Sequence, residues 1–93
     1  MAKVGSVELK IARIEGFRVR IRYLGGPDVR GDREGMPAYP YERASRDAWT
    51  VADWRRERFS QVYPGFDVDV LDGDDNVVNA GQTRLETVRD SYD

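Results

Sequence analysis

Neither cysteine nor histidine occurs among the 93 residues of the chain. These two absences exclude disulfide-stabilised scaffolds, zinc sites built from Cys and His, thiol nucleophiles and every catalytic triad with imidazole as the base. Lysine is scarce as well, because Lys3 and Lys10 are the only two, and neither lies in a predicted concavity. A catalyst would depend on carboxylate pairs such as Asp67 and Asp69, which an open strand does not desolvate enough to shift their pKa values. We expect a protein that is not an enzyme and binds no cofactor.

Long apolar runs are also missing, and no stretch approaches the roughly 20 residues that a membrane-spanning helix needs. The first six residues contain no apolar segment of the secretory type, so the expected location is the cytoplasm and no membrane contact is expected. A chain of this length forms one domain, which we place over residues 1–93, and buries only roughly 60–65% of its unfolded surface. One thin hydrophobic core leaves little room for an internal ligand pocket.

Two segments near the start of the chain alternate apolar and polar residues, at 7–11 and at 17–23. Strict alternation is typical of strands with one buried face. A three-residue loop over 14–16, with Gly16 in the left-handed conformation, keeps the apolar residues of both segments on one face. This register places Glu8 opposite Arg22 and predicts an N-terminal β-hairpin.

Residues 24–50 form a long connection rich in glycine and proline. Loops of this length are uncommon in small domains and are usually functional or disordered. Its apolar residues lead us to expect that much of it packs against the domain. A helix is predicted to follow, with Thr50 as N-cap, Asp53 completing a capping box, and an end at residues 63–65. At about 100° per residue, the apolar side of this helix holds Val51, Ala52, Trp54, Phe59, Val62 and Tyr63.

The last third of the chain predicts a second hairpin and a final helix. Residues 66–70 alternate again, residues 72–76 are typical of a turn, and a return strand is expected to begin at Val77. A second capping-box pattern at Thr83 precedes the last helix. The resulting order is ββ, long loop, α, ββ, α. The predicted fold class is α+β, with a small antiparallel sheet of two β-hairpins and two helices packed on one face.

Negative charge is concentrated near the C-terminus: residues 67–93 hold 8 acidic against 2 basic residues, whereas residues 1–66 hold 9 against 13. Five of the carboxylates fall within nine residues, at Asp67, Asp69, Asp72, Asp74 and Asp75. Part of this stretch matches the first positions of a calcium-binding loop, but Val77 stands where that loop requires glycine and Thr83 where it requires glutamate. We predict no metal site, and interpret the stretch as either a solvated turn or an acidic surface for a basic partner.

The basic residues are almost all arginine, and three of them follow one strand. Arg18, Arg20 and Arg22 lie on one face at a spacing of about 6.6–7 Å, close to the spacing of phosphates along a nucleic acid. Together with Arg56 on the predicted helix they form a candidate nucleic-acid surface. The alternative is a solvated sheet face, because the nearest aromatic residues point to the opposite side.

Two aromatic residues of the long loop, Tyr39 and Tyr41, flank a proline on a stiff extended backbone. Exposed tyrosines suit protein recognition because they offer a large contact area at little entropic cost. These two residues are therefore candidates for partner binding. The alternative is a loop that acts as a lid over a thin core.

In size and composition the chain resembles the small cysteine-free proteins of phages and mobile elements, many of which bind and block a host protein. We expect a non-catalytic protein-binding module, including the inhibitor type, that engages its partner through charged and aromatic surfaces. One alternative is a nucleic-acid-binding protein that uses the arginine face. A further alternative is a structural subunit of a larger assembly. The sequence does not reveal the oligomeric state.

Overall fold

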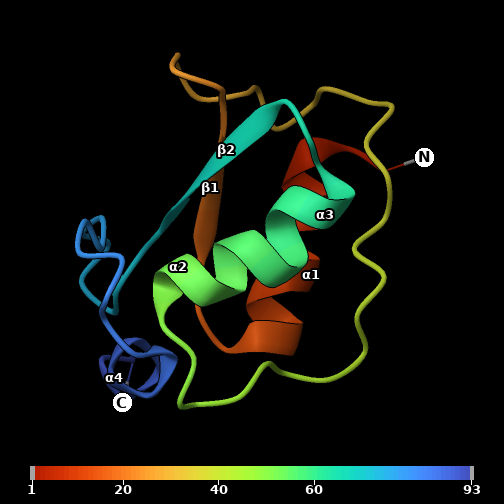
Figure 1. The fold of residues 1–93 in the computed structure, drawn as a ribbon. Helices are drawn as coiled ribbons and strands as arrows, with labels where there is room; N and C mark the ends of the chain where they lie inside the picture. The colour runs from red at the N-terminus through yellow and green to blue at the C-terminus, as the bar shows by residue number, and fades with distance from the viewer. Residues whose placement is uncertain (1, 93) are drawn as a thin grey trace.

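A computed structural model describes residues 2–92 of the chain (Figure 1). The elements follow in the order helix α1 (Val4–Glu15), strand β1 (Val19–Tyr23), helix α2 (Val51–Trp54), π-helical segment η1 (Arg55–Phe59), helix α3 (Ser60–Val62), strand β2 (Phe66–Val70) and helix α4 (Leu85–Asp90). The fold is α+β with a small antiparallel sheet. Among residues 2–92, no helix combines the length and the apolarity that crossing a bilayer requires.

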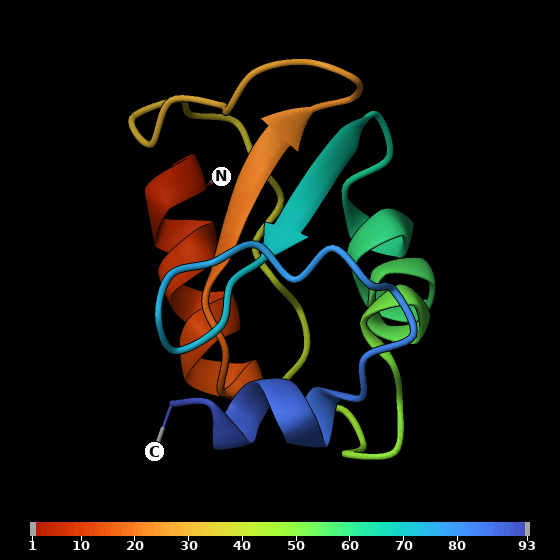
Figure 2. The ribbon, with the colours of Figure 1, turned by 90° about the vertical axis from the view of Figure 1, so that its left-hand side faces the viewer.

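The sheet consists of β1 and β2, which run antiparallel although more than forty residues separate them in sequence (Figure 2). Val19 stands opposite Val70, and Tyr23 stands opposite Phe66. The other edge of β1 is covered in part by the following loop, because the Val29 N–H donates to the Ile21 carbonyl at 2.9 Å. These pairings confirm strands within 17–23 and at 66–70.

The predicted strand at 7–11 is wrong, because these residues belong to α1. Of the apolar residues in this run, only Val7 and Ile11, four residues apart, share one face of a helix; together with Val4 they recur at helical spacing and are buried. Leu9, which the strand would have turned inward, is 74% exposed. The left-handed conformation predicted for Gly16 is present, with φ 83°, but it ends a helix instead of turning a hairpin.

The second predicted hairpin is also wrong. After β2 the chain makes an isolated bridge between Leu71 and Val77 and two backbone hydrogen bonds, from the Val78 N–H to the Val70 carbonyl and from the Asp72 N–H to the Asn76 carbonyl. No return strand forms within residues 2–92. The final helix is present, with Leu85 and Val88 buried as expected, but its N-cap is Arg84 and no side chain caps it. The observed order is therefore αβ, loop, α, β, α.

The central helix begins as predicted. Thr50 Oγ1 accepts the Asp53 N–H at 3.1 Å while Asp53 Oδ2 accepts the Thr50 N–H at 3.0 Å, which is a complete capping box. The wider turn of η1 follows, and Phe59 at its end is buried as predicted, with its ring 5.9 Å from the Trp54 ring. Ala52, which was also predicted to face the core, is exposed.

Residues 24–50 pack against the domain, as expected, and run along its surface as a strap (Figure 1). Lys3 offers no side-chain cap to α1, and carbonyls of the strap take that role. The Val4 N–H donates to the Arg33 carbonyl and the Gly5 N–H to the Gly31 carbonyl, both at 2.9 Å. The strap is thereby fixed on the first turn of α1.

Candidate interaction surface

The arginine face of β1 is matched by the carboxylates of β2. Arg22 stands opposite Asp67 in the register, with Nη2 at 3.0 Å from Asp67 Oδ2 and Nε at 2.9 Å from Asp69 Oδ2. Opposite charges on facing strands stabilise the pairing. Two of the five predicted partner-binding carboxylates are therefore engaged within the molecule.

The other two arginines of this face also lie beside carboxylates. Arg20 Nε is 3.6 Å from Asp28 Oδ2, and Arg18 forms an ion pair with Asp75. The sequence predicted Arg18 and Asp75 for different surfaces, yet the fold brings them together. The face is thereby close to neutral, and it lacks the unpaired cations that phosphate binding requires.

The acidic turn is organised by its own first carboxylate. Asp72 Oδ1 accepts the backbone N–H of Asp74 at 2.9 Å and that of Asn76 at 3.0 Å, and Asp75 adopts a left-handed φ of 64°. Such a turn is typical of Asp and Asn. Within residues 2–92 no group of three acidic side chains is arranged to hold a metal ion.

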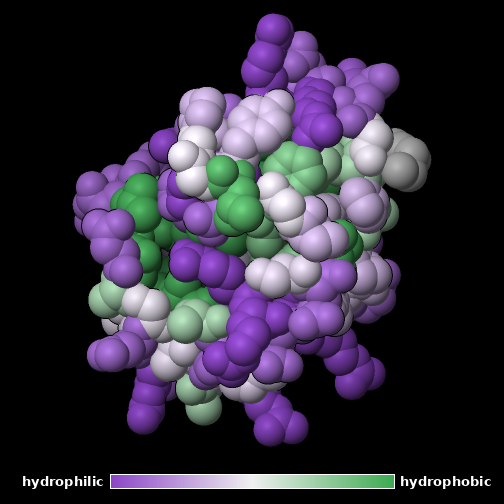
Figure 3. Space-filling view, turned by 45° about the horizontal axis from the view of Figure 1, so that its top comes forward, coloured by the Kyte–Doolittle hydropathy of each residue, from purple (hydrophilic) through white to green (hydrophobic). Residues whose placement is uncertain are grey.

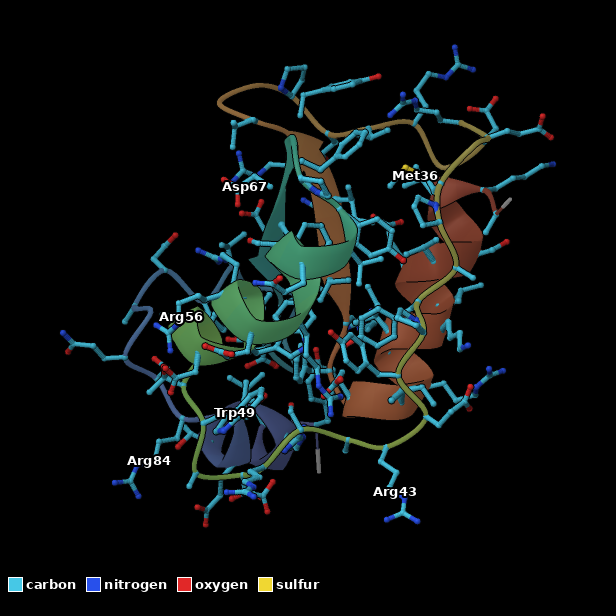
Figure 4. All side chains as sticks on the ribbon, turned by 45° about the vertical axis from the view of Figure 1, so that its right-hand side comes forward. Met36, Arg43, Trp49, Arg56, Asp67 and Arg84 are labelled. Atoms are coloured by element: carbon cyan, nitrogen blue, oxygen red, sulfur yellow. The ribbon has the colours of Figure 1, made fainter. Side chains whose placement is uncertain are left out.

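Arg56 lies on η1, and its guanidinium pairs with Asp53 at 2.8 Å and with Glu57 at 3.0 Å. Figure 4 labels Arg56 on η1 and Asp67 near the start of β2. The fourth arginine proposed for nucleic-acid binding therefore also lies beside carboxylates of the same chain.

The loop aromatics lie against the core. Tyr39 is fully buried; its hydroxyl donates to Glu15 Oε2 at 2.6 Å and accepts the Trp54 indole N–H at 3.1 Å. Tyr41 is half-buried, with its ring 5.1 Å from that of Tyr39 and 4.4 Å from the Arg58 guanidinium carbon. Tyr39 is therefore not accessible to a partner. Its position agrees with the alternative in which the loop covers the core.

A polar cluster that the sequence did not predict surrounds Glu15. This carboxylate is fully buried and receives hydrogen bonds from the Ser45 N–H at 2.9 Å and the Ser45 hydroxyl at 2.6 Å, in addition to that from Tyr39. Arg58 and Arg89 also donate to it. We call these five residues the polar clamp: Glu15, Tyr39, Ser45, Arg58 and Arg89. The clamp joins α1, the strap, η1 and α4.

The electrostatics of the polar clamp favour the ionised form of its carboxyl group. Burial alone would raise the pKa of Glu15, but the hydrogen bonds from Ser45, Tyr39 and Arg58 outweigh burial and hold this pKa below its ordinary value. The same burial, together with the bond to Glu15, raises the pKa of the Tyr39 hydroxyl. Solvent does not reach Glu15, and its hydrogen bonds all come from groups of the same chain, so the polar clamp holds the strap to α1, η1 and α4.

One end of the sheet exposes apolar and aromatic side chains. Leu24 is 70% exposed and Tyr23 is 44% exposed, and the half-buried Phe66 ring lies 6.1 Å from the Tyr23 ring. The guanidinium carbon of Arg33 lies 4.9 Å from the Phe66 ring centre and 5.9 Å from that of Tyr23. We call Tyr23, Leu24, Arg33 and Phe66 the aromatic end. Figure 3 shows hydrophobic residues side by side toward this end, with hydrophilic groups around them.

The backbone of the aromatic end is held by hydrogen bonds within its loop. The Gly26 N–H donates to the Tyr23 carbonyl at 2.9 Å, and Gly25 has a φ of 67°, a combination that closes a tight turn with Leu24 at its corner. A second hydrogen bond, from the Tyr23 N–H to the Pro27 carbonyl at 3.0 Å, closes the base of the loop. The signal in the sequence is the pair Tyr23-Leu24, which breaks the alternation of the strand immediately before two glycines.

A second exposed feature is an open groove of about 440 Å³ between α1 and the start of β1. Its apolar lining includes Leu9 and Val19, and its charged residues are already engaged, since Arg18 pairs with Asp75 and Glu8 accepts the Ile21 N–H at 2.7 Å. Burial raises the pKa of Glu8. The groove offers a partner little unpaired charge.

Comparison with known proteins identifies no relative. A scan against family models finds no match, and neither curated proteins nor solved structures match the chain.

Proposed function

We propose that the chain is a non-catalytic protein-binding module and that its partner contacts the aromatic end. The observation that carries this proposal is Leu24, whose side chain is 70% exposed at the corner of a hydrogen-bonded turn. Because the backbone of this turn is already hydrogen-bonded, a partner does not have to order it, so more of the burial energy of the leucine contributes to affinity. Tyrosine and arginine beside it are residue types enriched at the energetic centres of protein interfaces.

The paired charges elsewhere support a protein partner over a nucleic acid. Binding along a phosphate backbone depends on several unpaired cations, and Arg18, Arg20, Arg22 and Arg56 each lie beside a carboxylate of the same chain. When the charges of a surface pair with one another, they attract a partner only weakly over long distances. The apolar aromatic end is then the main source of affinity. A module of this type inhibits when it covers a surface that its partner needs for another contact.

Site-specific photo-crosslinking in the native host tests the proposal. A photoreactive phenylalanine analogue is placed at position 24 and, as a matched control, at the exposed position Gln82. We expect a crosslink to one different protein from position 24 and none to that protein from position 82. The addition of Arg33→Gln should weaken the crosslink at position 24.

Other outcomes of the same experiment would contradict the proposal. Crosslinks between copies of this chain would favour the structural-subunit alternative. Equal crosslinking from both positions would remove the assignment of the aromatic end. Binding of short DNA or RNA at low salt, with affinity falling steeply as salt is added, would favour the nucleic-acid alternative.

A further inference from the structure

Arg33 differs from the other arginines that stack on aromatic rings. Arg18 lies over Tyr92, Arg58 over Tyr41 and Arg89 over Phe17, and each of these three guanidinium groups also pairs with a carboxylate. Arg33 lies over Phe66 and Tyr23 but has no carboxylate partner within residues 2–92. Its neighbour Asp32 pairs with Arg30 instead, at 3.2 Å.

The geometry of stacking explains why such an arginine suits a carboxylate. A guanidinium that lies over a ring is shielded from water on one face, while its N–H groups point outward in its own plane. Those donors match the two oxygens of a carboxylate, and the pairing is stronger where the ring excludes water. The polar clamp shows both contacts in one residue, since Arg58 stacks on Tyr41 and donates to Glu15.

Arg33 is also held in place for this role. Its backbone N–H donates to the Arg30 carbonyl at 3.1 Å, and its own carbonyl caps α1 by accepting the Val4 N–H at 2.9 Å. The base of the side chain is thus fixed at both backbone groups. A partner that meets it does not need to order the strap first.

We infer, on the basis of the proposed function, that the partner presents a carboxylate side chain next to an apolar side chain. The carboxylate pairs with Arg33, and the apolar side chain covers Leu24 and the exposed part of Tyr23. A nucleic acid is disfavoured at this position, because the nearby Arg20, Arg22 and Arg30 all pair with carboxylates and Arg33 is then a single cation.

Selection from a displayed library of random linear peptides tests the inference. Peptides are selected on the immobilised wild-type chain and depleted on Leu24→Ser, which removes the apolar side chain without adding a charge, so that the survivors bind at the aromatic end. We expect the survivors to share Asp or Glu beside Leu, Ile, Phe or Met. For a selected peptide, Arg33→Gln should weaken binding roughly tenfold or more, and Arg33→Lys should restore part of the loss.

The matched control is Arg30→Gln, which removes another exposed arginine of the same loop that already has a carboxylate partner and should change affinity less than about twofold. Replacing the acidic residue of the peptide by its amide should have little further effect on the Arg33→Gln chain, since the two changes remove the same contact. Circular dichroism confirms that each variant is folded.

The experiment distinguishes failure of the inference from failure of the proposed function. Survivors that need Leu24 but lack an acidic residue, or that bind Arg33→Gln as tightly as wild type, would overturn the inference and leave the proposed function standing. A library with no peptide that depends on Leu24, or binding of labelled oligonucleotides that is lost in Arg33→Gln, would overturn both.

Discussion

The two ends of the molecule use the same residue types in opposite ways. At the polar clamp, arginines stack on aromatic rings and turn their donors inward to a carboxylate that is fully buried. At the aromatic end, Arg33 stacks on Phe66 in the same manner, but no carboxylate of residues 2–92 meets it and Leu24 beside it is 70% exposed. The clamp is complete within the chain, and the aromatic end is not.

This difference separates residues that hold the fold from residues available to a partner. Small domains bury a limited fraction of their surface, so an ordered internal network is valuable at the point where a long loop must be fixed. The clamp fixes the strap through Tyr39 and Ser45. The exposed side chains of the aromatic end bury little surface in the core, so the isolated chain does not need them for its stability.

The largest effect is expected for Glu15→Ala. This change leaves two half-buried arginines and a buried hydroxyl without their common acceptor, and breaking a buried ion pair typically destabilises a protein by about 3–5 kcal/mol. The free energy of unfolding, measured with guanidinium chloride, should fall by this amount. Glu34→Ala, at an exposed position of the strap, is the control and should change little. A loss below about 1 kcal/mol for Glu15→Ala would show that the clamp does not hold the fold.

A smaller loss is expected for Tyr39→Phe. The ring remains, but the hydroxyl that links Glu15 to the Trp54 indole N–H is removed, so one buried donor loses its acceptor. The expected destabilisation is about 1–3 kcal/mol in the same assay. Tyr41→Phe is the matched control, since the Tyr41 hydroxyl has no hydrogen bond within the described part of the chain. Equal losses for the two variants would contradict a specific role of the Tyr39 hydroxyl.

The pH dependence of stability should carry the signature of Glu15. Because its pKa is lower in the folded chain than the ordinary value of 4.5, the unfolded chain binds the proton more readily. The stabilisation is therefore complete above the unfolded pKa and is lost as pH falls through the folded pKa. Unfolding free energies measured from neutral pH to pH 3 should fall more steeply for wild type than for Glu15→Gln.

Glu8 provides an internal contrast on the same helix. Burial raises its pKa, so its contribution is complete below the unfolded pKa and is lost as pH rises through the folded pKa, the reverse of Glu15. Carboxyl chemical shifts followed by NMR measure both groups directly. A Glu15 shift that titrates above 4.5 would contradict the hydrogen-bonded clamp.

Elements that depend on residues close together in sequence were predicted correctly. The capping box at Thr50 and Asp53 depends on two residues three apart, and the strand at 66–70 follows from alternation that the fold keeps. Residues 7–11 were ambiguous, because Val7 and Ile11 fit one face of a strand and also one face of a helix. Val4 and Ile14, which lie outside the run, continue the helical spacing and pack with the core.

The candidate site depended on contacts that are distant in sequence. Arg22 and Asp67 are 45 residues apart, and nothing in either segment indicates that their charges cancel. Glu15 gave no signal, since a single carboxylate before a glycine is typical of an exposed helix end. Its five hydrogen bonds come from three other parts of the chain. Tyr23 and Leu24 did carry a signal, because two apolar residues in succession interrupt the pattern of the strand.

The smallest effect on stability is expected at the aromatic end. Its size distinguishes a role in folding from a role in binding. Leu24→Ala should change the free energy of unfolding by no more than about 0.5 kcal/mol, because the side chain is already in solvent. Leu85→Ala, the same substitution at a fully buried leucine, should cost about 2–5 kcal/mol. Both are measured by denaturant unfolding.

A large loss for Leu24→Ala would mean that the loop needs this side chain to fold, and the separation between the two ends would fail. If the loss is negligible, the exposure of a leucine at the corner of a hydrogen-bonded turn is not explained by the fold of the isolated chain. Solvated apolar surface adds nothing to folding, but it adds about 25 cal/mol per Å² when a partner removes it from water. The same variant should then weaken crosslinking from the adjacent Tyr23 position while leaving unfolding unchanged, which assigns the side chain to binding alone.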